Sequence, residues 1–167
     1  MVICASRTLT KILFIMKKII LVAAMVLGFA VAASAQPRAL GIRGGWGAEL
    51  SYQHSLGANF AEFDLGLYGT NSLNVAATYN FMLAQPSWTS RGEWGVYGGP
   101  GAVAGLGLGE GGYLSAGVVA QLGLEYSFWF PLQISLDIRP QIALTLADQM
   151  ALGFGGFYPS LGLRYKF

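Results

Sequence analysis

One histidine in the chain has neighbours of the types used in nucleophilic catalysis. His54 is the only histidine among the 167 residues, Ser55 follows it directly, and the carboxylates Glu49 and Glu62 lie close to it in the sequence. Serine, histidine and a carboxylate form a catalytic triad when the histidine is within hydrogen-bond reach of both partners. The pattern indicates an enzyme only if the fold brings these side chains to one point.

Other kinds of site chemistry have less support. The chain has no second histidine, no HExxH motif and a single cysteine, Cys4, so we expect no metal site. The run GEGG at residues 109–112 has no following helix and no lysine, so it is interpreted as a turn and not as a phosphate-binding loop. No cofactor is predicted.

The N-terminal part of the chain is typical of an exported protein. From Met16, two lysines precede an apolar run over residues 19–33, and a small-x-small site ends at Ala35, the layout of a secretory signal peptide. The run is shorter than the ~20 residues of a membrane-spanning helix. We therefore predict a signal peptide at residues 16–35 with cleavage after Ala35. Residues 1–15 are either a long basic leader or the product of a start codon assigned too early, Met16 being the true start.

Cleavage would change the charge of the protein. Four of the ten basic residues precede residue 36, so residues 36–167 carry six bases against eight acids and a formal net charge of −2 instead of +2. A nucleic-acid partner is therefore not expected. Cys4 would also be lost and does not lie in a lipobox, so neither a disulfide framework nor a lipoprotein anchor is predicted.

Residues 36–167 form one predicted domain in which apolar residues alternate with small or polar ones, as in a two-faced β-strand. Strands are expected near residues 61–69, 73–84, 93–107, 113–128, 132–145 and 157–167. Residues 40–54 could be one strand, which gives seven in all, or two strands joined by a tight turn at Gly44-Gly45, which gives eight. Because bacterial single-chain outer-membrane barrels have even strand numbers, we predict eight.

Alternation alone leaves open which face meets water. The polar face consists mostly of Gly, Ser, Gln and Asn, a signal peptide would deliver the chain to the outer membrane, and aromatic residues gather at strand ends. These features favour an all-β, eight-stranded antiparallel up-and-down transmembrane β-barrel over a soluble lipocalin-like barrel. With both termini periplasmic, most aromatic residues fall at periplasmic strand ends.

Several segments resemble a known family. The C-terminal LGLRYKF resembles the recognition strand of Gram-negative outer-membrane barrels, and GIRGGWGAELSYQHSLG, LSAGVVAQLGLEYSF and FPLQISLDIRP resemble small outer-membrane β-barrel proteins common in Bacteroidetes. The resemblance implies an OmpA/OmpX-like barrel in the outer membrane of a Gram-negative bacterium. It implies contact with lipid and lipopolysaccharide, and insertion by the barrel assembly machinery. The expected assembly signal is Leu163, Tyr165 and Phe167, and the protein is expected to be a monomer.

The lumen of an eight-stranded barrel is just wide enough for side chains to fill. Strand parity places nine charged residues inside it, and because unpaired buried charges are costly, we predict a salt-bridge network that plugs the barrel. A conducting pore has too little room. The predicted network consists of Arg43, Glu49, Glu62, Asp64, Glu125, Asp137, Arg139, Arg164 and Lys166.

One predicted strand is rich in inward glycines. Its inward residues are Gly95, Tyr97, Gly99, Gly101, Val103 and Gly105. The plainer interpretation is that the missing side chains give room to bulky neighbours or allow a tight bend. The alternative is the wall of a narrow apolar cavity that could admit an acyl chain or a small hydrophobic molecule.

The predicted topology argues against the enzyme. Some eight-stranded outer-membrane barrels modify lipid A with a histidine, a serine and a carboxylate, but His54 is expected in a periplasmic turn, far from the outer leaflet. The loops on the other side look short, and only the predicted loop at residues 146–156 is long and apolar enough to contact a partner. We therefore predict a non-enzymatic outer-membrane barrel with a structural or envelope-interaction role. The alternatives are a conduit or binding protein for small hydrophobic molecules and a lipid A-modifying enzyme.

Overall fold

The structure is a computed structural model and describes residues 36–45, 47–68, 71–108, 112–147 and 149–167. All regular secondary structure in these ranges is β-strand, and the strands form one sheet. No helix in the same ranges is long and apolar enough to cross a membrane. The predicted leader, signal peptide and cleavage site lie outside the described residues, as do Trp46 and most of the GEGG turn.

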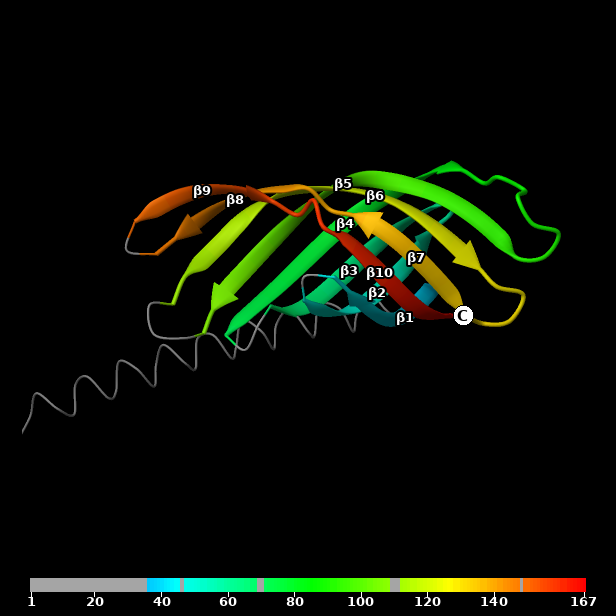
Figure 1. Ribbon diagram of the computed structural model, residues 1–167, viewed down its shortest axis with the longest axis horizontal. Helices are drawn as coiled ribbons and strands as arrows, with labels where there is room; N and C mark the ends of the chain where they lie inside the picture. Colours follow the sequence, from blue (N-terminus) through cyan, green and yellow to red (C-terminus); the bar gives the residue numbers. More distant parts are fainter. Residues whose placement is uncertain (1–35, 46, 69–70, 109–111, 148) are drawn as a thin grey trace, which may run out of the picture. The chain divides into compact units, whose positions relative to one another are not determined.

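The strand segments are labelled in Figure 1. They are β1 (Pro37–Gly44), β2 (Ala48–Leu56), β3 (Asn59–Tyr68), β4 (Ser72–Ala84), β5 (Glu93–Gly107), β6 (Leu114–Ser127), β7 (Gln133–Ile138), β8 (Gln141–Leu146), β9 (Met150–Gly155) and β10 (Pro159–Lys166).

Strands β7 and β8 are two halves of one long strand. Both pair with β6, and one register runs from Ile138 to Gln141 across the gap between them. Pro140 lies in the gap, has no amide hydrogen and so cannot donate to the ladder. Its carbonyl oxygen still accepts a hydrogen bond of 2.9 Å from the amide of Ala120. The proline therefore interrupts the assigned strand without ending the pairing.

Strands β9 and β10 are likewise one strand, broken by a bulge at Gly156. Its φ of +82° is in the left-handed region that favours glycine. A Cβ here would lie 1.9 Å from the carbonyl oxygen of Arg139, whose amide donates to the Gly156 carbonyl at 3.1 Å. The prediction of a loop at residues 146–156 was wrong over most of its length, because Met150–Gly155 forms β9 and pairs with β8.

With these two joins, eight antiparallel strands close into a barrel. If β7 with β8 and β9 with β10 are each counted as one strand, every strand pairs with the next along the chain. β10 then pairs with β1 and closes the ring. The predicted split of residues 40–54 is confirmed: β1 ends at Gly44 and β2 begins at Ala48, with the amide of Gly45 donating to the Gly47 carbonyl at 3.1 Å. The predicted all-β, eight-stranded antiparallel barrel is confirmed.

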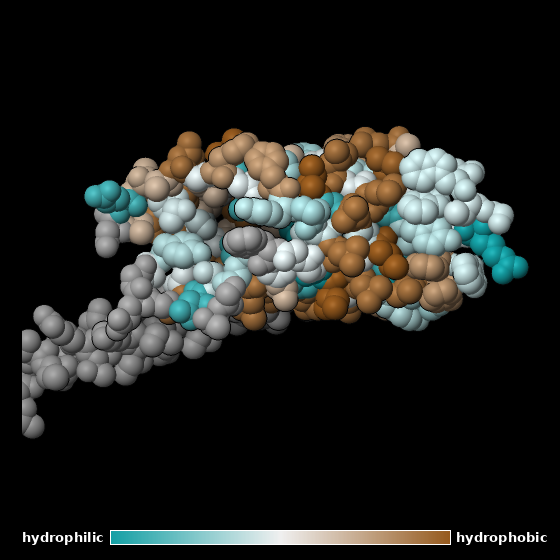
Figure 2. All heavy atoms as spheres, viewed as in Figure 1, coloured by the Kyte–Doolittle hydropathy of each residue, from teal (hydrophilic) through white to brown (hydrophobic). Residues whose placement is uncertain are grey.

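The two faces of the wall differ sharply in polarity. Alternate residues that face outward are large, apolar and exposed, such as Ile42 with 63% of its surface exposed, whereas the buried residues between them are mainly polar or charged. Figure 2 shows apolar side chains spread over the visible outer surface of the barrel. The barrel therefore has its polar groups inside and its apolar groups outside.

The wall is not equally high all round. β5 and β6 have 15 and 14 residues, whereas β1, β2 and β3 have eight, nine and ten. β8 and β9 extend the tall side, and β9 is an end of the sheet, pairing with β8 alone among the described strands. In Figure 1 this hairpin lies at the opposite end of the barrel from the C-terminus.

Aromatic rings gather at the end of the barrel that carries the C-terminus. Trp94 contacts Trp88 and Tyr126 at centroid distances of 5.3 and 4.8 Å, and Tyr126 contacts Phe128 at 4.6 Å. These residues lie at or next to the β4–β5 and β6–β7 connections. The rings thus form a dense belt where the sequence predicts a girdle.

Candidate functional site

The centre of the lumen is a buried layer of hydrogen-bonded polar side chains. Arg164 on β10 is fully buried; it donates to Ser51 Oγ on β2 at 2.9 Å, to Ser135 Oγ on β7 at 2.6 Å and to Glu62 Oε1 on β3 at 2.9 Å. Its planar guanidinium presents several donors in fixed directions and so connects separate strands. Arg164 therefore joins four parts of the wall through the middle of the barrel.

Glu62 is the common acceptor of this layer. Besides Arg164, it accepts hydrogen bonds from Gln53 at 2.7 Å and from Gln121 and Arg139 at 3.3 Å each. A buried carboxylate is tolerated when its oxygens are fully paired. Glu62 meets this condition, and its partners come from β2, β6, β10 and the gap between β7 and β8.

A second group of charges lies next to this layer. Arg43 donates to Glu49 at 2.5 Å and, through Nε, to Asp137 at 3.0 Å. Arg139 pairs with Asp64 at 2.5 Å and with Glu49 at 3.5 Å. Carboxylates thus surround both guanidinium groups. In the described ranges, the buried side-chain atoms without a partner are Asp64 Oδ1, Asn80 Oδ1, Gln133 Oε1 and Arg139 Nε.

A third group includes a residue that the sequence analysis missed. Arg38 pairs with Glu125 and donates to Gln53 at 2.7 Å, and its guanidinium lies 4.1 Å from the centroid of the Phe60 ring. The β1–β2 register shifts between Pro37 and Ala39. Because a bulge changes which way the next side chain points, strand alternation carries no signal that Arg38 would turn inward.

Eight of the nine predicted lumen charges are buried inside the barrel, and the ninth is not. Lys166, expected inside, lies near the rim and pairs with Glu93 at 3.3 Å, the two side chains being 35% and 78% exposed. It therefore lies apart from the network. Because β10 ends at Lys166, an inward-facing side chain at this position reaches the rim of the barrel and not the lumen.

The glycines of β5 leave no open space at their own positions. A Cβ at Gly99 would lie 1.8 Å from the carbonyl oxygen of Tyr79 on β4. A Cβ at Gly101 would lie 2.3 Å from the carbonyl oxygen of Ala77 on the same strand. A Cβ at Gly105 would meet the side chains of Asn74 and Ser115. One at Gly95 would meet the side chains of Glu125 and Met82. These contacts match the plainer interpretation, in which glycine gives room to its neighbours.

Tyr97, between these glycines, fills the lumen. It is fully buried and packs edge-on against Phe60 at a centroid distance of 5.2 Å. Of the six residues predicted as a possible apolar cavity wall, Val103 alone lines the cavity described next.

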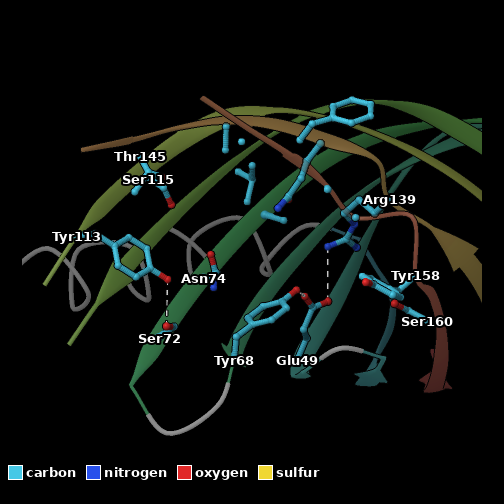
Figure 3. A pocket seen from close by; sticks show the side chains of 18 of the residues that line it. Glu49, Tyr68, Ser72, Asn74, Tyr113, Ser115, Arg139, Thr145, Tyr158 and Ser160 are labelled. Carbon is cyan, nitrogen blue, oxygen red and sulfur yellow. Dashed lines mark hydrogen bonds and ion pairs between the residues drawn. The ribbon is translucent and has the colours of Figure 1, made fainter. Parts of the chain in front are cut away.

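A cavity of about 700 Å³ lies beyond the charged layers, at the end of the barrel with the taller wall (Figure 3). Arg43, Glu49 and Arg139 form its floor, and Tyr68 donates a hydrogen bond to Glu49 there. Its walls combine serine, threonine, asparagine, glutamine and tyrosine side chains with a few small or apolar residues. The cavity is within the ~300–1,000 Å³ range of small-molecule sites.

The candidate triad is not assembled. His54 lies in β2 and pairs with Ala61, so its predicted place in a turn was wrong. Its Nδ1 is 3.2 Å from the hydroxyl of Tyr52. Glu49 and Glu62 face the lumen and are engaged by arginines, whereas His54 follows the opposite parity. In the described ranges no group of histidine, cysteine or acidic residues could hold a metal ion.

The predicted assembly signal lies on the outer face at the C-terminal rim. Leu163, Tyr165 and Phe167 are all exposed, and Tyr165 packs edge-on against Phe167 at a centroid distance of 5.2 Å. The amide of Phe167 donates to the carbonyl of Arg38 at 3.1 Å. The last residue is thus tied to the first strand and presents its ring outward.

Comparison with protein-family models, with curated proteins and with solved structures found no match to this chain.

Proposed function

We propose that this protein is an integral outer-membrane β-barrel with a sealed lumen and a structural or envelope-interaction role, and that it is not an enzyme. The observation that carries the proposal is the polarity of the wall, which is apolar outside and charged inside. Exposing large apolar side chains to water costs about 25 cal/mol per Å². The same face is favourable against lipid tails, as in transmembrane barrels.

The sealed lumen is supported by the buried layer around Arg164 and Glu62. Both side chains are fully buried, and aromatic and amide side chains fill the space next to them. An eight-stranded barrel has room for side chains and none for an aqueous channel. We therefore expect no ion conductance through the barrel.

The alternative functions have weaker support. A conduit for small hydrophobic molecules would use the glycine-rich wall of β5, where neighbouring atoms already occupy the space. A lipid A-modifying enzyme would need His54 beside a carboxylate, and the two nearest in sequence face the other side of the wall. A soluble lipocalin-like binder would need an apolar lumen.

The partners we propose are inferred from the apolar outer face of the barrel. Outer-membrane lipid and lipopolysaccharide would contact the apolar wall of a monomer, and the barrel assembly machinery would recognise the strand that ends at Phe167. The resemblance of several segments to small Bacteroidetes outer-membrane barrels supports the same location in a Gram-negative envelope.

The test is cell fractionation followed by gel mobility in SDS with and without boiling. We expect the protein in the outer membrane, migrating differently after heating because a closed barrel resists cold SDS. The same purified protein should show no channels in planar bilayers. A soluble periplasmic protein without a heat-dependent shift would refute the membrane proposal, and reproducible channels would refute the sealed lumen.

A further inference from the structure

The walls of the cavity carry hydrogen-bonding groups that have no partner among the described residues. Asn74 on β4, Ser115 on β6, and Gln141 and Thr145 on β8 all line the cavity. None of these side chains has a hydrogen-bond partner in the part of the chain that the structure describes. By contrast, the charged side chains below leave only Asp64 Oδ1 and Arg139 Nε as buried atoms without a partner in the described ranges. Within the described residues, these side chains therefore line the cavity with unpaired hydrogen-bonding groups.

These unpaired groups have a common chemistry. Each is neutral, and each hydroxyl or carboxamide can both donate and accept a hydrogen bond. A sugar hydroxyl has the same two-way capacity, so a ring of such groups suits a molecule with many hydroxyls. Tyrosine rings of Tyr68 and Tyr113 add flat apolar area with a polar end. Figure 3 shows these two residues with Asn74 and Ser115 around the cavity.

The floor does not favour a charged ligand. Each guanidinium there is held by carboxylates: Arg43 by Glu49 and Asp137, and Arg139 by Asp64. An incoming anion would have to displace these carboxylates, and an incoming cation would have to compete with the arginines. A purely apolar ligand would leave the wall amides without partners, which costs free energy for each buried polar group.

We infer that this cavity binds a neutral, polyhydroxylated molecule, a carbohydrate of mono- or disaccharide size. The wall carboxamides and hydroxyls hydrogen-bond its hydroxyl groups, and the tyrosine rings cover its ring faces. This binding does not depend on the membrane proposal, because all the groups involved lie inside the barrel.

The test uses residues 36–167 refolded in an amine-oxide detergent, which has no sugar headgroup to compete. Saturation-transfer NMR and calorimetry would measure binding of glucose, maltose and N-acetylglucosamine. Glucose 6-phosphate serves as the charged comparator and cyclohexanol as the apolar one. We expect saturable millimolar or tighter binding of at least one neutral sugar, and weaker binding of both comparators.

Three variants examine the site, and one examines a distant position. Asn74→Leu and Gln141→Leu replace a carboxamide with an apolar side chain of similar size. Thr145→Trp fills part of the cavity with a bulky ring. Each should weaken sugar binding tenfold or more. Gln85→Leu, at an exposed position outside the strands at the other end, should leave it unchanged. A heat-dependent gel shift confirms that each variant is folded.

The inference is overturned by any of three results. The first is no saturable binding of any neutral sugar to the unmodified protein. The second is equal or tighter binding of glucose 6-phosphate or cyclohexanol. The third is unchanged sugar affinity in folded Asn74→Leu, Gln141→Leu and Thr145→Trp.

Discussion

Replacing Arg164 with methionine tests whether the buried network holds the barrel together. Methionine resembles the aliphatic stem of arginine and has no hydrogen-bond donor, so the change removes the guanidinium group and keeps the packing of the stem. It deletes the hydrogen bonds to Ser51, Ser135 and Glu62. Glu62 stays buried with one guanidinium partner, Arg139, at 3.3 Å.

The expected cost follows from these contacts. Breaking a buried ion pair by removing one partner costs about 3–5 kcal/mol, because the other charge stays buried. Two hydroxyls also lose a partner, at about 1 kcal/mol each. Added together, these contributions would be about 5–7 kcal/mol. Because Arg139, Gln53 and Gln121 still donate to Glu62, the net cost should be lower, about 3–5 kcal/mol, a large part of a typical stability of about 5–15 kcal/mol.

The assay is reversible urea unfolding of the refolded barrel, followed by tryptophan fluorescence and by the heat-dependent gel shift. Lys166→Met is the matched control, because its partner Glu93 is exposed and such pairs contribute about 0–1 kcal/mol. In the double variant Arg164→Met, Glu62→Gln the orphaned charge is removed. Its cost should fall below the sum of the single costs by about 2 kcal/mol.

Two outcomes would refute the reasoning. If Arg164→Met costs no more than Lys166→Met, the buried layer does not stabilise the barrel. If the double variant costs the full sum of the two single variants, Arg164 and Glu62 act independently, and the ion pair at 2.9 Å is not the source of the effect.

Three further predictions concern the wall, the bulge and the C-terminus. Ile42→Arg, on the outer face of β1, should lower stability in lipid vesicles by up to about 4 kcal/mol, because an arginine on a lipid-facing wall is costly, whereas Gln85→Arg should change it little. Gly156→Ala should lower the free energy of unfolding by about 1–3 kcal/mol, whereas Gly155→Ala, with nothing within 4 Å of its Cβ position, should be nearly neutral. Phe167→Ala should reduce the amount of protein in the outer membrane several-fold in cells and leave the stability of the refolded barrel almost unchanged.

Each of these predictions has a contrary result. Unchanged or increased stability of Ile42→Arg would mean that the outer face meets water. Equal effects at residues 155 and 156 would mean that the left-handed backbone plays no part. Normal outer-membrane levels of Phe167→Ala would show that the terminal aromatic is not needed for assembly.

The strands and their faces could be predicted from the sequence because they depend on local order. Successive side chains of a strand point to opposite faces. The alternation in residues 132–145 therefore already divides the residues of the strand into the two sets that face in opposite directions. The same rule explains two errors. Met150, Leu152 and Phe154 alternate as in a strand, yet residues 146–156 were expected to form an apolar loop. Lys166 has inward parity, yet it lies where the strand ends.

The partners inside the lumen could not be predicted in the same way. Arg164 contacts Ser51 and Glu62 across separations of 113 and 102 residues, and Arg43 contacts Asp137 across 94. Which inward residues meet depends on the stagger of strands that are not neighbours, and a bulge of one residue changes it. Arg38 shows this directly, since a register shift turns it toward Glu125.

The sequence by itself determined that residues 36–167 form two-faced β-strands and where most of them turn, because the period of two and the turn residues are local properties. The tertiary structure decided which charges pair, that neighbours fill the glycine-rich wall, and that a polar cavity remains beyond the plug. These features arise where side chains from distant strands meet, and their geometry exists only once the barrel has closed.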